Sequence, residues 1–383
     1  MTSRQQLTMK QLTINNNVIS LYIHLPFCKK KCNYCDFVSY AGKEDLIDEY
    51  VESLCKEIKT AGPQDYQTIY FGGGTPTLLS PKHFDKVLKT LTHLHKTPPP
   101  LPEGEGKKEN DIEISIETNP GTADKAKLKV LRELGINRLS IGAQSFNNQH
   151  LKTLGRIHSA EDIIRFYNDA RSAGFENINL DLIFALPGQT LAEWQADIQT
   201  ALKLKPEHLS VYNLQIEEGT PFHLKRSTLN LPQEDLELAM YEDTIESLTS
   251  AGFKHYEISN FSKPGFECKH NLFYWRNGNY LGVGAGAHSH VDGQRWANPN
   301  SIENYIHDPR PSPQDQSSPL IFRQETIFMG LRLLDGLEIE KFKGFEQEVA
   351  DSIGDNLLTK DKDNYKLTRK GLYLANLVFE RFV

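Results

Sequence analysis

Short apolar runs alternate with amphipathic segments along the first two thirds of the chain. Each run is bounded by polar or glycine-containing turns, as buried strands are, and the segments between them repeat apolar residues at helical spacing. The sequence predicts strands at 19–24, 68–71, 112–117, 138–142, 178–184 and 208–212. Because strands and helices alternate with short connections, we expect an α/β fold with a parallel sheet built from βαβ units.

A parallel sheet of this extent favours a full or partial TIM-like (β/α) barrel over a short doubly wound sheet. Such barrels carry their functional residues at the carboxyl ends of the strands. The polar or glycine-rich breaks of this sequence fall at those ends, in a cysteine-rich loop, at 72–77, at 117–120, at Gln144 and at Asp181. We therefore expect the functional site on that face of the barrel.

The remainder of the chain changes in composition and predicts further units. Its last part combines amphipathic helices with a hairpin-like segment at 357–367, as in a small winged-helix-like α+β domain. The expected divisions are an N-terminal tail at 1–18, a barrel at 19–255, a segment rich in Gly, His and aromatic residues at 256–307, a linker at 308–319 and a C-terminal domain at 320–383.

The composition argues against several classes of protein. A formal net charge of -7 disfavours a nucleic-acid-binding surface. No apolar run approaches the roughly 20 residues that span a bilayer, and the first residues lack the apolar core of a secretory signal. We therefore expect a cytoplasmic protein without a membrane span. Five cysteines, three of them within eight residues, do not resemble a disulfide framework.

Those three cysteines, Cys28, Cys32 and Cys35, follow the first predicted strand. Thiolates this close on one loop can converge on a single soft metal centre. A structural zinc site requires four protein ligands, and only His24 lies near enough in sequence to be the fourth, since Cys268 is isolated. Three thiolates around a four-iron cluster instead leave one iron without a protein ligand, where a small molecule can bind.

The spacing Cys28-x3-Cys32-x2-Cys35, with Tyr34 before the last cysteine, resembles the signature of radical S-adenosylmethionine (SAM) proteins. The sequence on either side of this motif is similar to that of the oxygen-independent coproporphyrinogen III oxidase family. The segments that carry this similarity are 21–27, 70–77, 114–117, 141–145, 179–183 and the final 60 or so residues. The resemblance implies a radical SAM partial (β/α)6 barrel, a 4Fe-4S cluster held by the three cysteines, and SAM bound to that cluster.

The resemblance also implies which residues contact SAM. Glycines allow close approach of the backbone to a cofactor, and Arg156 offers a planar fork for a carboxylate. Asp181 lies in an otherwise apolar strand and needs a partner or ligand. The implied SAM residues are Tyr22, Tyr34, Gly73, Gly74, Thr75, Glu117, Gln144, Arg156 and Asp181. The last three match positions that the family associates with a second SAM molecule, so one or two molecules are expected, and no catalytic residue is assigned.

Two departures separate this chain from the true oxidases of the family. The oxidases have a fourth cysteine two positions after the third, where this chain has Phe37, and they carry a longer extension than the 27 residues before Cys28. Both features resemble the haem-chaperone branch. The segment His270-Asn-Leu-Phe-Tyr-Trp275 is similar to the haem-binding motif of that branch, which implies His270 as a haem ligand, with Cys268 ranked below it.

The resemblance thus predicts an iron–sulfur protein that binds haem and delivers it to acceptor haemoproteins. The alternative is an oxidase that decarboxylates the propionates of coproporphyrinogen III to vinyl groups, and a third class is a silent scaffold. Whether the chain is an enzyme is therefore left open. An electron donor is an expected partner, a membrane-associated acceptor and a homodimer are possible partners, and nucleic acid is not.

Overall fold

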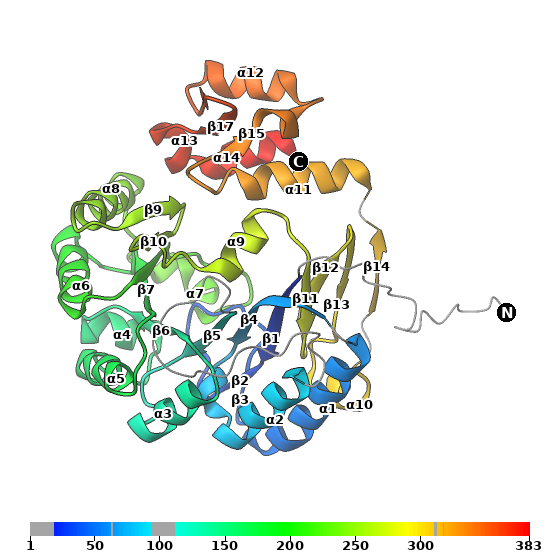
Figure 1. Ribbon diagram of the computed structural model, residues 1–383. Helices are drawn as coiled ribbons and strands as arrows, with labels where there is room; N and C mark the ends of the chain where they lie inside the picture. Colours follow the sequence, from blue (N-terminus) through cyan, green and yellow to red (C-terminus); the bar gives the residue numbers. More distant parts are fainter. Residues whose placement is uncertain (1–18, 63, 93–111, 310–311, 317) are drawn as a thin grey trace.

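The computed structural model describes residues 19–62, 64–92, 112–309, 312–316 and 318–383, so the expected tail at 1–18 lies outside the described residues. Within these ranges no helix is both long and apolar enough to cross a lipid bilayer. A curved sheet forms the centre of the larger unit, helices cover its outer face, and the C-terminal residues form a smaller unit beside it (Figure 1).

Six consecutive parallel strands make up the centre of the sheet, in the order in which they occur along the chain. They are β1 (Ile19–Leu25), β4 (Tyr66–Gly73), β5 (Glu113–Thr118), β6 (Arg138–Gln144), β7 (Ile178–Phe184) and β8 (His208–Asn213). Most of their residues are buried, as expected for a sheet that carries helices on its outer face and side chains inside the barrel. The predicted six-stranded partial barrel is confirmed.

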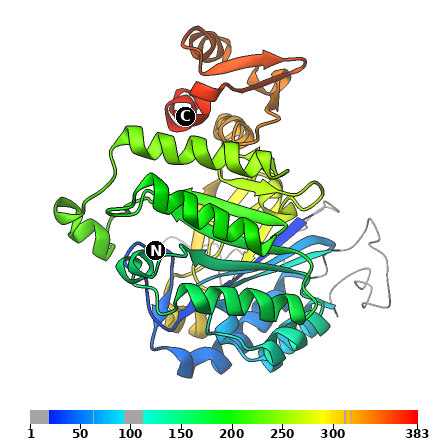
Figure 2. The same ribbon diagram turned by 90° about the vertical axis from the view of Figure 1, so that its left-hand side faces the viewer.

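The outer helices lie roughly parallel to one another along the sheet (Figure 2). They are α1 (Ile47–Ala61), α2 (Pro81–Thr92), α3 (Lys125–Glu133), α4 (Asn148–Leu154), α5 (Ala160–Ser172), α6 (Leu191–Leu204) and α8 (Glu234–Ser250). Helices α5 and α6 each begin with a capping box, formed by Ser159 with Asp162 and by Thr190 with Glu193. These caps satisfy N–H groups at the helix starts and fix where each strand-to-helix loop ends.

The sheet continues beyond both ends of these six strands, which gives twelve strands among the described residues. At one end β8 pairs with β10 and then β9, and at the other β1 pairs in parallel with β11, which is followed by antiparallel strands. The added strands are β9 (Lys254–Glu257), β10 (Asn260–Ser262), β11 (Tyr280–Val283), β12 (His288–Val291), β13 (Gln294–Ala297) and β14 (Ser312–Gln316). The segment expected at 256–307 is therefore part of the barrel sheet.

Strand β14 lies inside the segment for which the sequence predicts a linker, 308–319. It is the last strand of the sheet, an edge position at which proline is tolerated because one side of the strand has no ladder to complete. The Pro/Ser/Gln composition therefore gave no sign of the pairing with β13.

A buried carboxylate joins this sheet extension to the barrel. Glu57 of α1 accepts hydrogen bonds from the N–H of Gly284 (2.9 Å), the side-chain amide of Asn298 (2.7 Å) and the hydroxyl of Tyr305. Burial raises the pKa of Glu57 to about 7, while these donors favour its ionised form. The network holds the loop after β11 against α1 and so fixes the sheet beside β1.

The C-terminal unit has its own hydrophobic core, which includes Ile327, Phe342, Val349, Leu358 and Val378. Its elements are α11 (Pro319–Gly330), β15 (Leu337–Glu338), α12 (Glu346–Gly354), β16 (Leu358–Asp361), β17 (Asn364–Leu367), α13 (Arg369–Tyr373) and α14 (Ala375–Phe379). The predicted hairpin is the β16–β17 pair, and β15 completes a three-stranded sheet. The expected small α+β domain is thus present.

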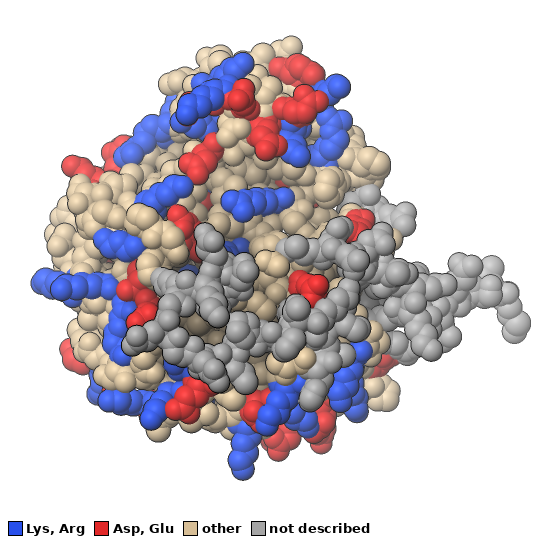
Figure 3. Space-filling model, viewed as in Figure 1, with Lys and Arg blue, Asp and Glu red and all other residues tan. Residues whose placement is uncertain are grey.

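Short elements complete the fold. They are β2 (Phe27–Cys28), β3 (Tyr40–Ala41), α7 (Pro221–Leu224), α9 (Lys269–Trp275) and α10 (Ile302–His307). On the face seen in Figure 3, outside the atoms drawn in grey, Lys and Arg are interspersed with Asp and Glu. That face therefore has no broad basic patch of the kind that binds a nucleic-acid backbone.

Candidate functional site

A cavity of about 530 Å³ lies at the carboxyl ends of the parallel strands. Its walls come from the cysteine loop after β1, from the ends of the following strands and from the turn after α4. Every residue predicted to hold the cluster or SAM lines this cavity except Tyr22. These lining residues are Cys28, Cys32, Tyr34, Cys35, Gly73, Gly74, Thr75, Glu117, Gln144, Arg156 and Asp181.

The cysteine loop is held in place by contacts of Asn33 and Tyr34. Asn33, between the second and third cysteines, donates its N–H to the carbonyl of Leu154 (3.0 Å) and its side-chain amide to the carbonyl of Thr153 (2.8 Å). Its carbonyl accepts the N–H of Phe222 (2.9 Å). The ring of Tyr34 packs on a separate apolar cluster. The chain's own atoms therefore fix the loop against α4 and α7.

The cysteine thiols have distinct polar neighbours. Cys28 Sγ lies 3.6 Å from Thr75 Oγ1, and Arg156 Nη1 donates to Cys32 Sγ over 3.5 Å. Burial raises the pKa of the Cys28 and Cys35 thiols, so metal binding, which requires thiolates, has to displace their protons. The Arg156 guanidinium offsets the negative charge that thiolate ligation brings to this wall.

A closed zinc site is not supported by these neighbours. His24, the only nearby candidate for a fourth zinc ligand, uses both ring nitrogens elsewhere: Nε2 donates to the Val38 carbonyl (2.8 Å), and Nδ1 accepts the Tyr22 hydroxyl (3.0 Å). The donor set that remains, three thiols on one cavity wall, fits a cluster with one iron free of protein ligands.

Tyr22, which the resemblance assigns to SAM, does not line the cavity. It lies in the middle of β1, and its hydroxyl contacts His24. The His24 ring in turn lies against the glycine turn, because a Cβ on Gly73 would come within 2.6 Å of it. Tyr22 therefore supports the cavity wall from behind.

The glycine turn after β4 packs against the start of the cysteine loop. Gly74 N–H donates to the Leu25 carbonyl (2.9 Å), and Thr75 N–H donates to the Phe27 carbonyl (2.7 Å). A Cβ on Gly74 would lie 2.6 Å from the Phe27 carbonyl oxygen. Side chains are therefore excluded here by the approach of the cysteine loop, in addition to any cofactor that lies in the cavity.

Two buried carboxylates line the cavity. Glu117 accepts the Tyr70 hydroxyl (3.0 Å) and the Gly73 N–H (3.1 Å), and Asp181 accepts the Ser140 hydroxyl (3.1 Å) and the Asn179 amide (2.8 Å). The partner expected for Asp181 is thus present. Burial raises both pKa values, that of Glu117 to about 7 with a further contribution from the charge of Asp181. A cationic ligand would stabilise both carboxylates, which fits the sulfonium group of SAM.

Arg156 connects three parts of the site. Besides Cys32, its guanidinium donates to the Gly142 carbonyl of β6 (2.7 Å) and to the side-chain oxygen of Asn119, which follows β5. Asn119 also donates to Thr75 Oγ1 (2.8 Å). Asn119 was not singled out by sequence reasoning, although its place directly after a strand end is the signal that could have found it.

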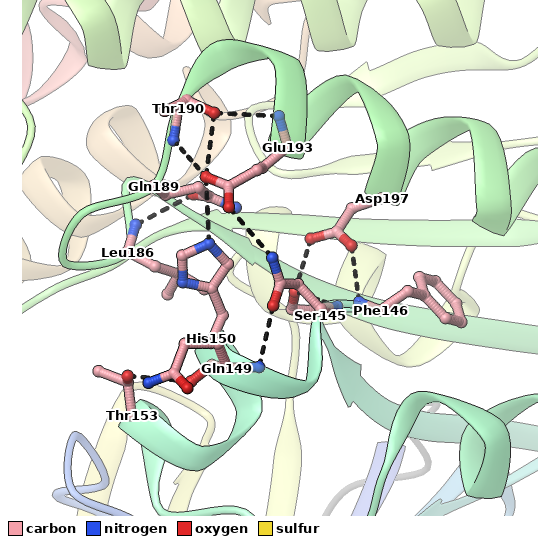
Figure 4. A network of polar contacts seen from close by, with 11 residues as sticks. Ser145, Phe146, Gln149, His150, Thr153, Leu186, Gln189, Thr190, Glu193 and Asp197 are labelled. Carbon is pink, nitrogen blue, oxygen red and sulfur yellow. Dashed lines mark hydrogen bonds and ion pairs between the residues drawn. The ribbon is translucent and has the colours of Figure 1, made fainter.

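Gln144 lies at a strained corner that ends β6, and its backbone has a positive φ of 68°. The buried carboxylate of Asp197 on α6 holds the next two residues, accepting the Ser145 hydroxyl (2.7 Å) and the Phe146 N–H (2.7 Å), as Figure 4 shows. A non-glycine residue in this conformation needs such external restraint. Asp197 therefore positions Gln144 at the cavity wall.

Replacement of Asp197 by alanine is expected to lower the free energy of unfolding by about 2–4 kcal/mol, because two buried donors lose their acceptor. Urea denaturation measures this change, and Glu246→Ala on the exposed face of α8 is the matched control. Equal midpoints for the two variants would show that the Gln144 corner does not depend on Asp197.

His270 lies outside the cavity, in the short helix α9. It is buried, with Nδ1 2.7 Å from Thr68 Oγ1 and Nε2 3.0 Å from the Tyr274 hydroxyl. Burial lowers its pKa to about 3. Glu113 accepts the N–H groups of Lys269 and His270 at 3.1 Å each and so anchors the start of α9. In this conformation the ring is a satisfied core group, so haem ligation at His270 would require α9 to move.

Comparison with known proteins identifies the family. A model of the radical SAM superfamily matches residues 22–201, and a model of the HemN C-terminal domain matches residues 322–374. The haem chaperone HemW of Bacillus subtilis is 37% identical, over 95% of this chain and 99% of its own length. The chain belongs to the HemW family. The HemW proteins of Lactococcus lactis and Escherichia coli are 36% and 35% identical, each over 95% of this chain and over 97% and 98% of their own lengths.

The fold of this HemW-family chain is similar to a solved structure, the coproporphyrinogen III oxidase HemN of Escherichia coli. The TM-score is 0.83 over 99% of this chain and 93% of HemN, at 23% sequence identity. At that identity the likeness concerns the fold, and it confirms the predicted architecture, including the C-terminal domain. Membership of a radical SAM family implies a 4Fe-4S cluster and SAM, in agreement with the residues of the cavity.

Proposed function

We propose that this protein is a haem chaperone, which binds haem and transfers it to acceptor haemoproteins. The observation that carries the proposal is its similarity over nearly the whole length to proteins named as haem chaperones. Phe37, at the position of the oxidases' fourth cysteine, favours the same function. Cytoplasmic location, an electron donor and a homodimer remain part of the proposal.

The proposed roles of the cavity residues follow from their chemistry. Cys28, Cys32 and Cys35 would hold the cluster, which when bound would supply an open iron to SAM. Arg156 stabilises the thiolates, and Glu117 and Asp181 accept the cationic part of SAM. Burial of both carboxylates strengthens their attraction to a cation because little water screens it. The number of SAM molecules, one or two, is left to direct measurement.

The second candidate function is coproporphyrinogen III oxidation, the activity named for HemN, whose fold this chain shares. In that reading the same cavity residues are needed, and SAM cleavage is coupled to decarboxylation of the substrate's propionates. The protein lacks the oxidases' fourth cysteine, because Phe37 occupies its position. A silent scaffold, the third reading, would not explain why three thiols, an arginine and two buried carboxylates line one cavity.

One experiment separates these functions. With the cluster reconstituted anaerobically, we expect wild-type protein to bind haem and to pass it to an apo-haemoprotein, with no formation of the divinyl product from coproporphyrinogen III. Absorbance of the haem and chromatography of the porphyrins measure these outcomes. Efficient formation of the divinyl product would support the oxidase instead, and failure to bind haem would contradict the chaperone proposal.

The same measurement of haem binding by absorbance, applied to His270→Ala, tests the haem ligand that the sequence predicts. A changed haem spectrum in this variant would support a state in which α9 has moved to free the ring. An unchanged spectrum and affinity would place the haem elsewhere.

A further inference from the structure

We propose that haem docks on the rim of the cluster cavity, with its flat face on three exposed apolar side chains and its carboxylates on the adjacent lysines. The apolar residues are Phe37, Ile157 and Tyr212, and the lysines are Lys29, Lys30 and Lys31; together they are called the cavity rim. The inference rests on the proposed haem-chaperone function and assigns that function a site distinct from His270.

The apolar part of the rim is unusually exposed. The exposed fractions are 65% for Phe37, 58% for Ile157 and 40% for Tyr212, yet all three line the same cavity. They come from the cysteine loop, the turn after α4 and the end of β8, three separate segments that border the cavity. Exposed large apolar side chains that line one pocket are typical of a binding site.

The three lysines form the basic part of the rim, and no ion pair joins them to another of the described residues. Lys29 Nζ donates to the Gly121 carbonyl and Lys31 Nζ to the Phe37 carbonyl, both at 3.0 Å. These acceptors are neutral carbonyls, so the contacts position the two ammonium groups without neutralising their positive charge. Asp36 and Glu217 are the acidic residues among the exposed lining residues, and the three lysines outnumber them. The loop that carries Phe37 therefore presents positive charge beside an apolar surface.

Haem matches this pairing of features, because it is a flat apolar macrocycle with two carboxylates at one edge. The interior of the cavity differs, since Glu117, Asp181 and Arg156 make it polar and ionic, as SAM requires. The rim and the interior thus suit two different ligands. Haem on the rim would lie over the cavity that holds SAM and would remain accessible to an acceptor protein.

The test compares haem affinity among rim variants with the cluster loaded under anaerobic conditions. We expect Phe37→Ser combined with Ile157→Ser to weaken haem binding by about tenfold or more, from the loss of buried apolar area. Lys30→Glu is expected to weaken it several-fold, and more strongly at low salt. The matched controls lie far from the rim in sequence. Leu377→Ser replaces a side chain on α14 that is 51% exposed, and Lys360→Glu reverses an exposed charge on β16. Iron content and SAM binding of each variant check that the cavity interior is intact.

Two further ligands distinguish the rim from an iron ligand in the protein. Metal-free protoporphyrin is expected to bind wild type with similar affinity and to lose affinity in the same rim variants. The dimethyl ester of haem is expected to be insensitive to Lys30→Glu. If wild type binds haem and the rim variants bind it equally well, or if only iron-containing porphyrin binds and His270→Ala abolishes it, the rim is not the site. If wild type binds no haem at all, the chaperone function itself fails.

Discussion

Cys28→Ala is expected to lose the iron–sulfur chromophore completely. The proposed open-iron cluster would have only three protein ligands, so removal of one would leave too few thiolates to retain it. The apoprotein should still fold, because the backbone pairing of β2 with β3 and the Asn33 contacts hold the loop without a cluster. Iron analysis and the visible absorption spectrum after anaerobic reconstitution measure the loss, and far-UV circular dichroism checks the fold.

Cys55→Ala is the matched control for this prediction. Cys55 is also buried, with an exposed fraction of 3%, but it packs in the core on α1 and does not line the cavity. This variant should load iron as wild type does. Equal iron content in Cys28→Ala and Cys55→Ala would show that the cysteine loop is not the cluster site, and the proposed function would lose its cofactor.

Sequence reasoning located the cavity because strand ends in a parallel barrel converge on one face. The alternation of strands and helices fixed that face, and Glu117 and Gln144 each lie at or near a strand end, whereas Asp181 lines the cavity from the middle of β7. The residues that support the site from a distance were not found. Asp197 lies on a helix and meets Ser145 only in the folded chain, so no local pattern reveals the contact.

Two predictions outside the cavity show a different limit. Tyr22 and His270 were assigned from resemblance, and the structure places both side chains in the barrel interior, with their rings 6.4 Å apart between centroids. Family motifs preserve residue identity, but the same residue can touch a ligand or pack in a core. The edge strand β14 was missed for another reason, because main-chain pairing at a sheet edge leaves little trace in composition.

Gly74→Ala is expected to destabilise the protein and to impair cluster loading together. Its new methyl group would lie 2.6 Å from the Phe27 carbonyl oxygen and 2.9 Å from the Phe27 nitrogen, and a backbone cannot move aside as a flexible side chain can. Overpacking of this kind costs about 1–3 kcal/mol. Because Phe27 directly precedes Cys28, the strain falls on the first of the proposed cluster ligands. Denaturant unfolding of the apoprotein and iron content after reconstitution measure the two effects.

The matched control for Gly74→Ala is Gly354→Ala, at the end of α12, where a Cβ would meet no atom within 4 Å. Its stability should change by less than about 1 kcal/mol, with no effect on iron, because alanine is also the better helix former. If Gly74→Ala has the same free energy of unfolding and the same iron content as this control, the glycine turn can accommodate a methyl group. A destabilised Gly74→Ala protein with normal iron content would instead show that the packing of the turn does not affect cluster binding by the cysteine loop. The paired loss is therefore the result that ties the packing of β4 to the geometry of the cluster site.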